Sequence, residues 1–133
     1  YINYMEKEKE IITNICKEMA QGDWKTHWAP NRYMLRPSGN PLTVDQHTEM
    51  LNSKDIVIKT QELVNINSIE IFTEIAVVCM TLHQVFTYKD IPNDDISVVL
   101  AVLKKEDNTW KMIHGARSQG RSPTDPPPVF PSN

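Results

Sequence analysis

The 133-residue chain has few of the features that cross-link small proteins or anchor chains in membranes. It holds two cysteines, Cys16 and Cys79, and neither belongs to a C-x-x-C pair or to a Cys/His ligand spacing. We therefore expect buried, reduced thiols, with a disulfide or a metal role as the alternative. No apolar run approaches the roughly 18 residues that a membrane-spanning helix needs. A chain of this length can build its core by packing alone.

An excess of positive charge is also missing. Fourteen Lys and Arg stand against seventeen Asp and Glu, so the formal charge is −3, and the pI is near 5.8. Nucleic-acid binding needs a basic surface, which argues against nucleic acid as the main partner. The size and the 40% hydrophobic content are typical of one globular domain. The first residue is Tyr1 rather than Met, which is consistent with a processed start, and we expect a cytoplasmic location.

Helical periodicity characterises residues 1 to about 53. Apolar residues recur at i, i+3, i+4 and i+7 of a first helix, namely Ile12, Ile15, Cys16 and Met19. Gly22 is suited to end this helix and Asp23 to cap a short second one. Thr43 and Gln46 have the spacing of a capping box, which predicts a third helix. Its expected inner positions are Val44, His47 and Leu51.

From Asp55 onward the apolar period changes to two, which predicts a meander of four long antiparallel strands. We expect turns near Phe72, at 91–94 and at Asp107–Asn108. Helices followed by such a sheet indicate a two-layer α+β domain over residues 1–120. Five of the nine prolines lie in the remaining tail, residues 121–133, which favours extended geometry. We predict a disordered tail, with a partner-binding arm as the alternative.

The predicted turns imply a register for the sheet. If Tyr88 pairs near Asp95 and Lys105 near Thr109, one row across three strands contains His83, Leu100 and His114. This row, together with Thr81, Val98, Trp110 and Met112, is expected to form the inner face. The outer face is then expected to carry Val99, Ala101 and Ile113, with Arg117 also outside unless a bulge turns it inward.

Three stretches carry a resemblance to a known superfamily: "HWAPNRYMLRPSGNPLT" from His27, the helix "VDQHTEML", and the closing "VLKKEDNTWKMIHGARSQG". In these residues and in its element order the chain resembles the nuclear transport factor 2-like (NTF2-like) proteins, and among them the SnoaL-like group. The closing stretch is also similar to the association domain of calcium/calmodulin-dependent protein kinase II. The resemblance implies a cone-shaped, strongly curved antiparallel sheet packed on N-terminal helices, an internal pocket, and association through the outer face of the sheet.

The resemblance implies no particular reaction, because this fold hosts many unrelated activities. A ketosteroid isomerase-like site needs a carboxylate base in an apolar pocket. No inner-face carboxylate is evident, and Glu62 is the nearest candidate. His83 and His114 are the candidates for a general acid or base. No close His pair is present, so we expect no metal site, and we expect no cofactor.

The residues expected to line the pocket come from every part of the domain: Trp24, His27, Trp28, Tyr33, Met34, His47, Leu51, Thr81, His83, Trp110, Met112 and His114. Two functions stay open. The first is a homodimer, associating through the outer face, whose pocket holds a small apolar or acidic molecule. The second is a small lyase or isomerase of the dehydratase or cyclase type that uses a pocket histidine.

Overall fold

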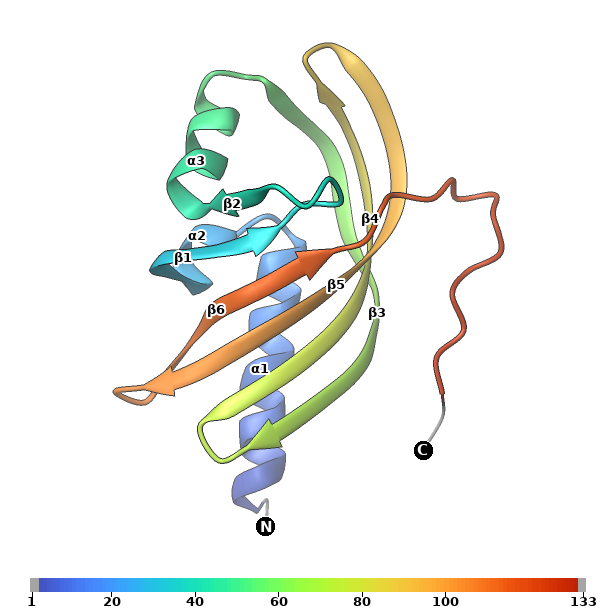
Figure 1. The fold of residues 1–133 in the computed structure, drawn as a ribbon. Coiled ribbons are helices and arrows are strands. Elements are labelled where there is room, and N and C mark those ends of the chain that lie inside the picture. Colours follow the sequence, from blue (N-terminus) through green and yellow to red (C-terminus); the bar gives the residue numbers. More distant parts are fainter. Residues whose placement is uncertain (1–2, 132–133) are drawn as a thin grey trace.

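A computed structural model describes residues 3–131 as three helices and six strands (Figure 1). The helices are α1 (Tyr4–Ala20), α2 (Trp24–His27) and α3 (Val44–Asn52). The strands are β1 (Trp28–Leu35), β2 (Pro41–Thr43), β3 (Ile56–Phe72), β4 (Ile75–Tyr88), β5 (Ile91–Glu106) and β6 (Thr109–Arg117). No helix in the described range is long and apolar enough to cross a membrane.

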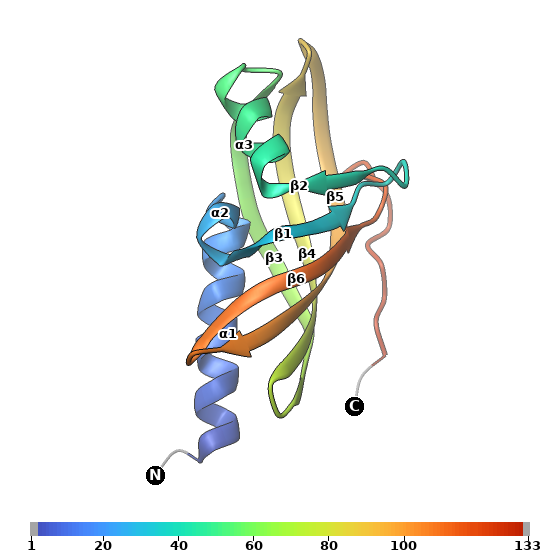
Figure 2. The same ribbon diagram turned by 60° about the vertical axis from the view of Figure 1, so that its left-hand side comes forward.

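All six strands form one curved, open sheet in the order β2-β1-β6-β5-β4-β3. Figures 1 and 2 show α1 lying on the hollow side of the sheet, with α3 above it near the start of β3. The prediction of an α+β domain with a curved sheet on N-terminal helices is confirmed. The sheet is mixed rather than purely antiparallel, because β1 runs parallel to β6.

The predicted helices form where capping residues satisfy their free N–H groups. Asn3 accepts a hydrogen bond from Glu6 N at 2.9 Å at the start of α1, and Asp23 accepts one from Thr26 N at the start of α2. The Thr43–Gln46 capping box opens α3, as the spacing predicts. The predicted apolar stripe of α1 enters the core. Cys16 in that stripe is a buried free thiol, whereas the free thiol of Cys79 is only half-buried.

The turns predicted near Phe72 and at Asp107–Asn108 are present, whereas the turn predicted at 91–94 lies at Lys89–Asp90 and both predicted registers differ from the observed ones. Tyr88 pairs with Ile91, and Lys105 pairs with Trp110. Lys89–Asp90 and Asp107–Asn108 are two-residue loops in which all four residues have positive φ, which is the conformation of a type I′ turn. Pro92 therefore lies within β5 rather than in a turn. It is tolerated there because β6 reaches only Val99, so this end of β5 is a free sheet edge.

This register reverses the predicted faces over most of the sheet, because side chains alternate along a strand. The inner face, which packs on α1, carries fully buried residues: Ala76, Val78, Met80, Val99, Ala101 and Leu103. The placement of Val99 and Ala101 outside was wrong. On the outer face, which is turned away from α1, Val77, Cys79 and Thr81 pair with Val102, Leu100 and Val98.

A buried carboxylate on α1 is hydrogen-bonded to residues of the sheet. Glu8 is 5% exposed and accepts hydrogen bonds from Lys105 Nζ at 2.7 Å and Trp110 Nε1 at 2.6 Å. Burial raises the pKa of Glu8, but the hydrogen bonds from Lys105 and Trp110 outweigh it and leave the pKa below its usual value. Glu8 is therefore charged at neutral pH, and it joins the first helix to the last hairpin.

We expect Glu8→Ala to lower the free energy of unfolding by about 2–3 kcal/mol, because the indole N–H of Trp110 loses its acceptor while staying buried. Chemical denaturation measures this loss, and the exposed Glu10→Ala on the same helix is the matched control. Since the folded pKa of Glu8 is lowered, its contribution is present above its unfolded pKa and disappears as the pH falls through the folded value. Equal stability of the two variants at pH 7 would contradict this role.

Candidate functional site

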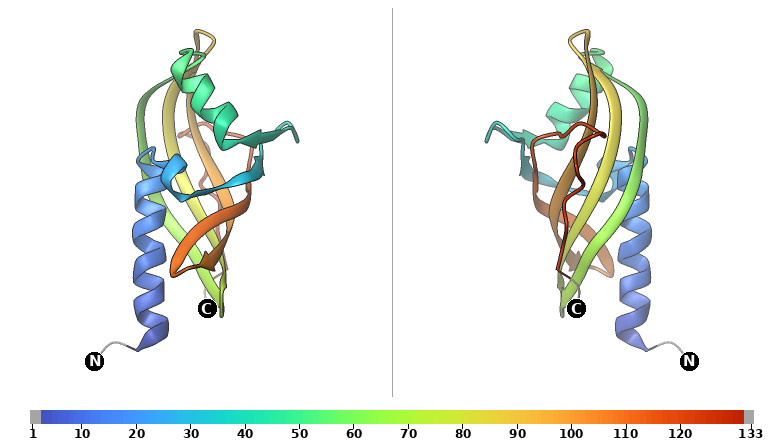
Figure 3. Two further views of the ribbon diagram at one scale, coloured as in Figure 1. Left: turned by 90° about the vertical axis from the view of Figure 1, so that its left-hand side faces the viewer. Right: turned by 90° about the vertical axis from the view of Figure 1, so that its right-hand side faces the viewer.

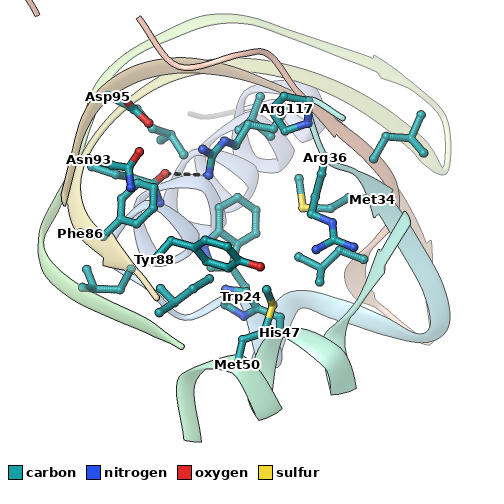
Figure 4. Close-up of a pocket in the computed structure, with 18 of the residues that line it drawn as sticks. Trp24, Met34, Arg36, His47, Met50, Phe86, Tyr88, Asn93, Asp95 and Arg117 are labelled. Carbon is teal, nitrogen blue, oxygen red and sulfur yellow. Dashed lines mark hydrogen bonds between the residues drawn. The ribbon is translucent and has the colours of Figure 1, made fainter. Parts of the chain in front are cut away.

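A cavity of about 470 Å³ lies between the upper part of the sheet, α2, α3 and the β1–β2 hairpin (Figure 4). This volume is in the range of small-molecule sites. Its walls are mostly apolar and aromatic, and the residues include Trp24, Met34, Leu42, Met50, Ile56, Ile58, Leu82, Phe86, Tyr88 and Val99. A few polar groups converge on this apolar interior, among them Arg36, His47, Gln84, Asp95, Trp28 and Arg117.

Arg117 reaches the cavity because β6 contains a bulge. Leu103 pairs with Met112 and Val102 with His114, so Ile113 has no partner of its own in β5. A bulge of one residue switches the face of every later side chain in a strand. Met112 therefore points inward before the bulge, and Arg117 points inward after it. Arg117 was expected on the outer face unless a bulge turned it inward, and the bulge at Ile113 turns it inward.

The Arg117 side chain is held by two neighbours on β4. Its Nη1 donates to Gln84 Oε1 at 3.2 Å, and its guanidinium carbon lies 5.9 Å from the centre of the Phe86 ring (Figure 4). Burial lowers the pKa of Arg117, and the nearby charge of Asp95 acts in the opposite direction. An arginine keeps its charge in proteins, so a cation is present in this largely apolar space. No salt-bridge partner lies within 4.0 Å of it among residues 3–131.

Two buried N–H groups on cavity residues have no hydrogen-bond partner in the described part of the chain: Arg117 Nε and Trp28 Nε1. Buried donors are almost always paired, and an unpaired one costs about 1–3 kcal/mol. Both groups can donate but cannot accept. A ligand that satisfies them must offer acceptor atoms.

His47 and Arg36 complete the polar lining. Burial lowers the pKa of His47, so the imidazole is neutral at pH 7, and its ring centre lies 6.2 Å from that of Trp28. Arg36 is bound to the β1–β2 turn through Nη2, which donates to Pro41 O at 3.4 Å. In Figure 4 the Tyr88 ring lies near the middle of the view, with Arg117 above it and Arg36 to its right.

Of the twelve residues predicted to line a pocket, four border this cavity: Trp24, Trp28, Met34 and His47. Trp110 and Met112 are buried in the core outside it. Tyr33 and Leu51 are largely exposed. His27 is buried between the helices, where its Nε2 contacts Glu18 Oε2 at 2.6 Å. None of these last five is among the residues that line the cavity.

As predicted, one face of the sheet carries His83, His114, Thr81, Val98 and Leu100, but the prediction that this is the inner face is wrong. Because Glu106 pairs with Thr109, one residue away from the predicted pairing of Lys105, Met112 shares the inner face with Leu103, which leaves Thr81 and His83 outside. The β6 bulge puts His114 outside as well. His114 makes an edge contact with Tyr33, with ring centres 5.4 Å apart. Thr81 accepts a hydrogen bond from Asn67 Nδ2 at 3.0 Å.

His83 lies between two carboxylates on the outer face. Its Nε2 is 2.6 Å from Asp94 Oδ1, and its Nδ1 is 3.2 Å from Glu62 Oε1. Hydrogen bonds to Asp94 and then Glu62 raise the pKa of His83, since only the protonated ring donates from both nitrogens. The three residues join β3, β4 and β5, and none of them faces the cavity.

Within the described chain, three potential metal ligands come together at the junction of α1 and α2. Ligand atoms of Glu18, Asp23 and His27 lie within 4.8 Å of one another. These groups already have partners in the protein: Glu18 contacts His27, and Asp23 caps α2 through Thr26 N. The cluster therefore fastens the two helices together, and its geometry is explained without an ion.

Several residues that line the cavity were not predicted to do so from the sequence. They include Phe86, Tyr88, Gln84, Asp95 and Arg117. The first three lie on the same face of β4 as Leu82, so the correct pairing of Glu106 with Thr109 at the second hairpin would have identified them together. Arg117 depends on the bulge at Ile113, for which the sequence gives no local signal. Leu42 and Met50 reach the cavity only through the packing of α3 and β2 on the sheet.

Comparisons with known proteins agree with this architecture. A family model described as "Protein of unknown function (DUF3804)" matches residues 8–125. An NTF2-like protein of unknown function from Prochlorococcus sp. NATL2A has 32% sequence identity and a TM-score of 0.77, and the match covers 86% of this chain and 94% of the other. No curated protein matches the chain at a significant level.

More distant structures share the fold. An NTF2-like protein from Cytophaga hutchinsonii has 18% identity and a TM-score of 0.70 over 88% of this chain and 98% of its own. The CaMKII hub of S. rosetta has 20% identity and a TM-score of 0.61 over 91% and 99% of the two chains. The curved sheet, the helices on its hollow side and these matches lead to one conclusion: the chain belongs to the NTF2-like proteins and, within them, to the family of unknown function DUF3804.

Proposed function

We propose that this protein is a binding and association module: its cavity holds a small organic acid with an apolar body, and two copies associate through the outer faces of their sheets. The observation that carries the binding half is the Arg117 guanidinium, which lies in an apolar cavity with an unpartnered Nε–H. The association half is supported by an apolar outer face and by the structural neighbours.

A carboxylate fits the polar groups of the cavity. Guanidinium groups bind carboxylates through paired, charge-assisted hydrogen bonds, and these are stronger than neutral ones. The charge of Asp95 is near Arg117, but no carboxylate of the described residues pairs with Arg117 within 4.0 Å, so a ligand carboxylate would be its direct partner. The surrounding aromatic and aliphatic side chains favour a ligand whose remaining atoms are apolar.

The outer face offers the area that association needs. Leu100 lies on β5, between β4 and β6, yet 48% of its surface is exposed. Val77, Cys79, Val98 and Val102 surround it as paired or adjacent outer residues. An exposed apolar patch in the middle of a sheet is typical of a protein interface. Among the structural neighbours are the hub of S. rosetta CaMKII and the association domain of C. elegans CaMKII.

The catalytic alternative would need acid/base residues other than the predicted ones, and Asp95 is a carboxylate that lines the cavity. His83 and His114, the predicted candidates, lie on the outer face and not at the cavity. His47 does line the cavity, but no carboxylate is hydrogen-bonded to it among residues 3–131 to orient it as a base. Binding therefore explains the observed geometry with fewer assumptions than turnover does.

We expect the chain to bind phenylacetate at least tenfold more tightly than phenylacetamide, because only the acid offers Arg117 an anionic partner. Arg117→Gln should weaken phenylacetate binding about 10–100-fold and remove most of the preference over the amide. Isothermal titration calorimetry at pH 7 measures both constants.

Arg32→Gln is the control for this series, since Arg32 is exposed on β1 and is not among the cavity residues. It should leave both constants unchanged. If the Arg117→Gln protein binds the acid as tightly as the wild type does, the carboxylate proposal is wrong.

For association, we expect Leu100→Asp to lower the dimer association constant at least tenfold, because a charge would be buried between the two outer faces. Sedimentation equilibrium gives the constant directly. The control is Ile11→Asp, which places the same charge on an exposed position of α1. A dimer that tolerates Leu100→Asp as well as Ile11→Asp would show that the outer face is not the interface.

A further inference from the structure

The C-terminal segment, residues 121–131, returns over the sheet instead of leaving it. Figure 3 shows this segment, coloured dark red, running in front of the strands in the right-hand view, on the side of the sheet opposite to α1. Figure 1 shows it as a separate layer beside the sheet. The segment and a second copy would therefore occupy the same side of the sheet.

The start of this segment is fixed by backbone pairing. Ser118 N donates to Val98 O, and Arg121 and Ile96 exchange two hydrogen bonds of 2.8 Å. These contacts continue the pairing of β5 beyond the end of β6. Gly120 fits closely between them, because a Cβ at this position would collide with the carboxyl group of Asp95. The direction in which the segment leaves β5 is therefore set by specific contacts.

The rest of the segment cannot join the sheet but is ordered by local bonds. Pro126, Pro127 and Pro128 have no N–H to donate to a strand. A turn precedes them, in which Asp125 N donates to Ser122 O at 3.0 Å, and Arg121 Nη2 donates to Pro126 O at 3.0 Å. This combination keeps the segment extended and close to its anchor at Ile96.

Near its end the segment turns its larger apolar side chain inward. Phe130 is 37% exposed, whereas its neighbour Val129 is 93% exposed. An isolated extended chain would expose both to a similar degree, so the lower exposure of Phe130 is what contact with other parts of the protein would produce. Leu100 in the middle of the outer face nevertheless stays half-exposed, so the segment covers the face only in part.

We propose that the C-terminal segment is a strap that competes with a second copy of the chain for the outer face. Two sheets that pack face to face lie about 10 Å apart, with their side chains filling the space between them. An additional layer of chain does not fit into that space. Association through the outer face therefore requires the strap to move aside, and the strap limits how readily the copies associate. This inference rests on the proposed association of the two outer faces.

The test compares association constants of full-length variants by sedimentation equilibrium. Phe130→Ala should raise the association constant about tenfold, because it removes most of an apolar contact that holds the strap down. Arg121→Pro removes the N–H that donates to Ile96 O and should act in the same direction. Val129→Ala changes an exposed neighbour and should leave the constant within about twofold of the wild type.

The outcomes separate the two proposals. If both Phe130→Ala and Arg121→Pro leave the association constant of the dimer unchanged or reduce it, the strap proposal is wrong and the proposed association still holds. A reduced constant would mean that the segment contacts the partner copy. A chain that stays monomeric in every variant overturns the proposed association and the strap together. Tighter association in both variants, with Val129→Ala unchanged, is the result that the strap requires.

Discussion

The positions of two tight turns determine which side chains face the interior of this protein. Lys89–Asp90 and Asp107–Asn108 each join their strands with two residues of positive φ. Since side chains alternate along each strand, a loop one residue longer or shorter would exchange the faces of one strand relative to its neighbour. The observed turns place Met80, Leu82 and Gln84 inside and His83 outside. The apolar contact with α1, the cavity lining and the exposed outer face all follow from this register.

The bulge at Ile113 adds one exception to this alternation, and it has a chemical consequence. It allows β6 to contribute Met112 to the core and Arg117 to the cavity, although an unbroken strand would point them to opposite faces. Placing a guanidinium in an apolar space costs free energy, as the lowered pKa of Arg117 indicates. Gln84 and the Phe86 ring offset only part of this cost. A carboxylate ligand would supply the missing countercharge, which is why the binding proposal centres on this residue.

Much of the fold was predictable from the sequence because the relevant signals are local. The stripe of Ile12, Cys16 and Met19 and the capping box at Thr43 identified helices α1 and α3. The turn at Lys89–Asp90 was missed because it lacks the Asn-Gly or Asp-Gly pair that usually marks a type I′ turn, while Pro92 and Asn93 resemble a turn but lie in a strand. The faces were reversed at the second hairpin, where the turn at Asp107–Asn108 was predicted but the expected pairing of Lys105 with Thr109 is one residue away from the observed one. The cavity depended on this register and on a bulge, so only residues from the helices and β1, such as Trp24, Trp28 and His47, were placed at it correctly.

A crystal structure of the protein with bound phenylacetate would test the central claim most directly. Our account predicts that the carboxylate lies within hydrogen-bond distance of Arg117 Nε, with the phenyl ring among the aromatic and aliphatic residues of the cavity. The account would be contradicted by a cavity filled with the protein's own side chains, or by an Arg117 side chain that pairs with Asp95 and leaves the acid bound elsewhere.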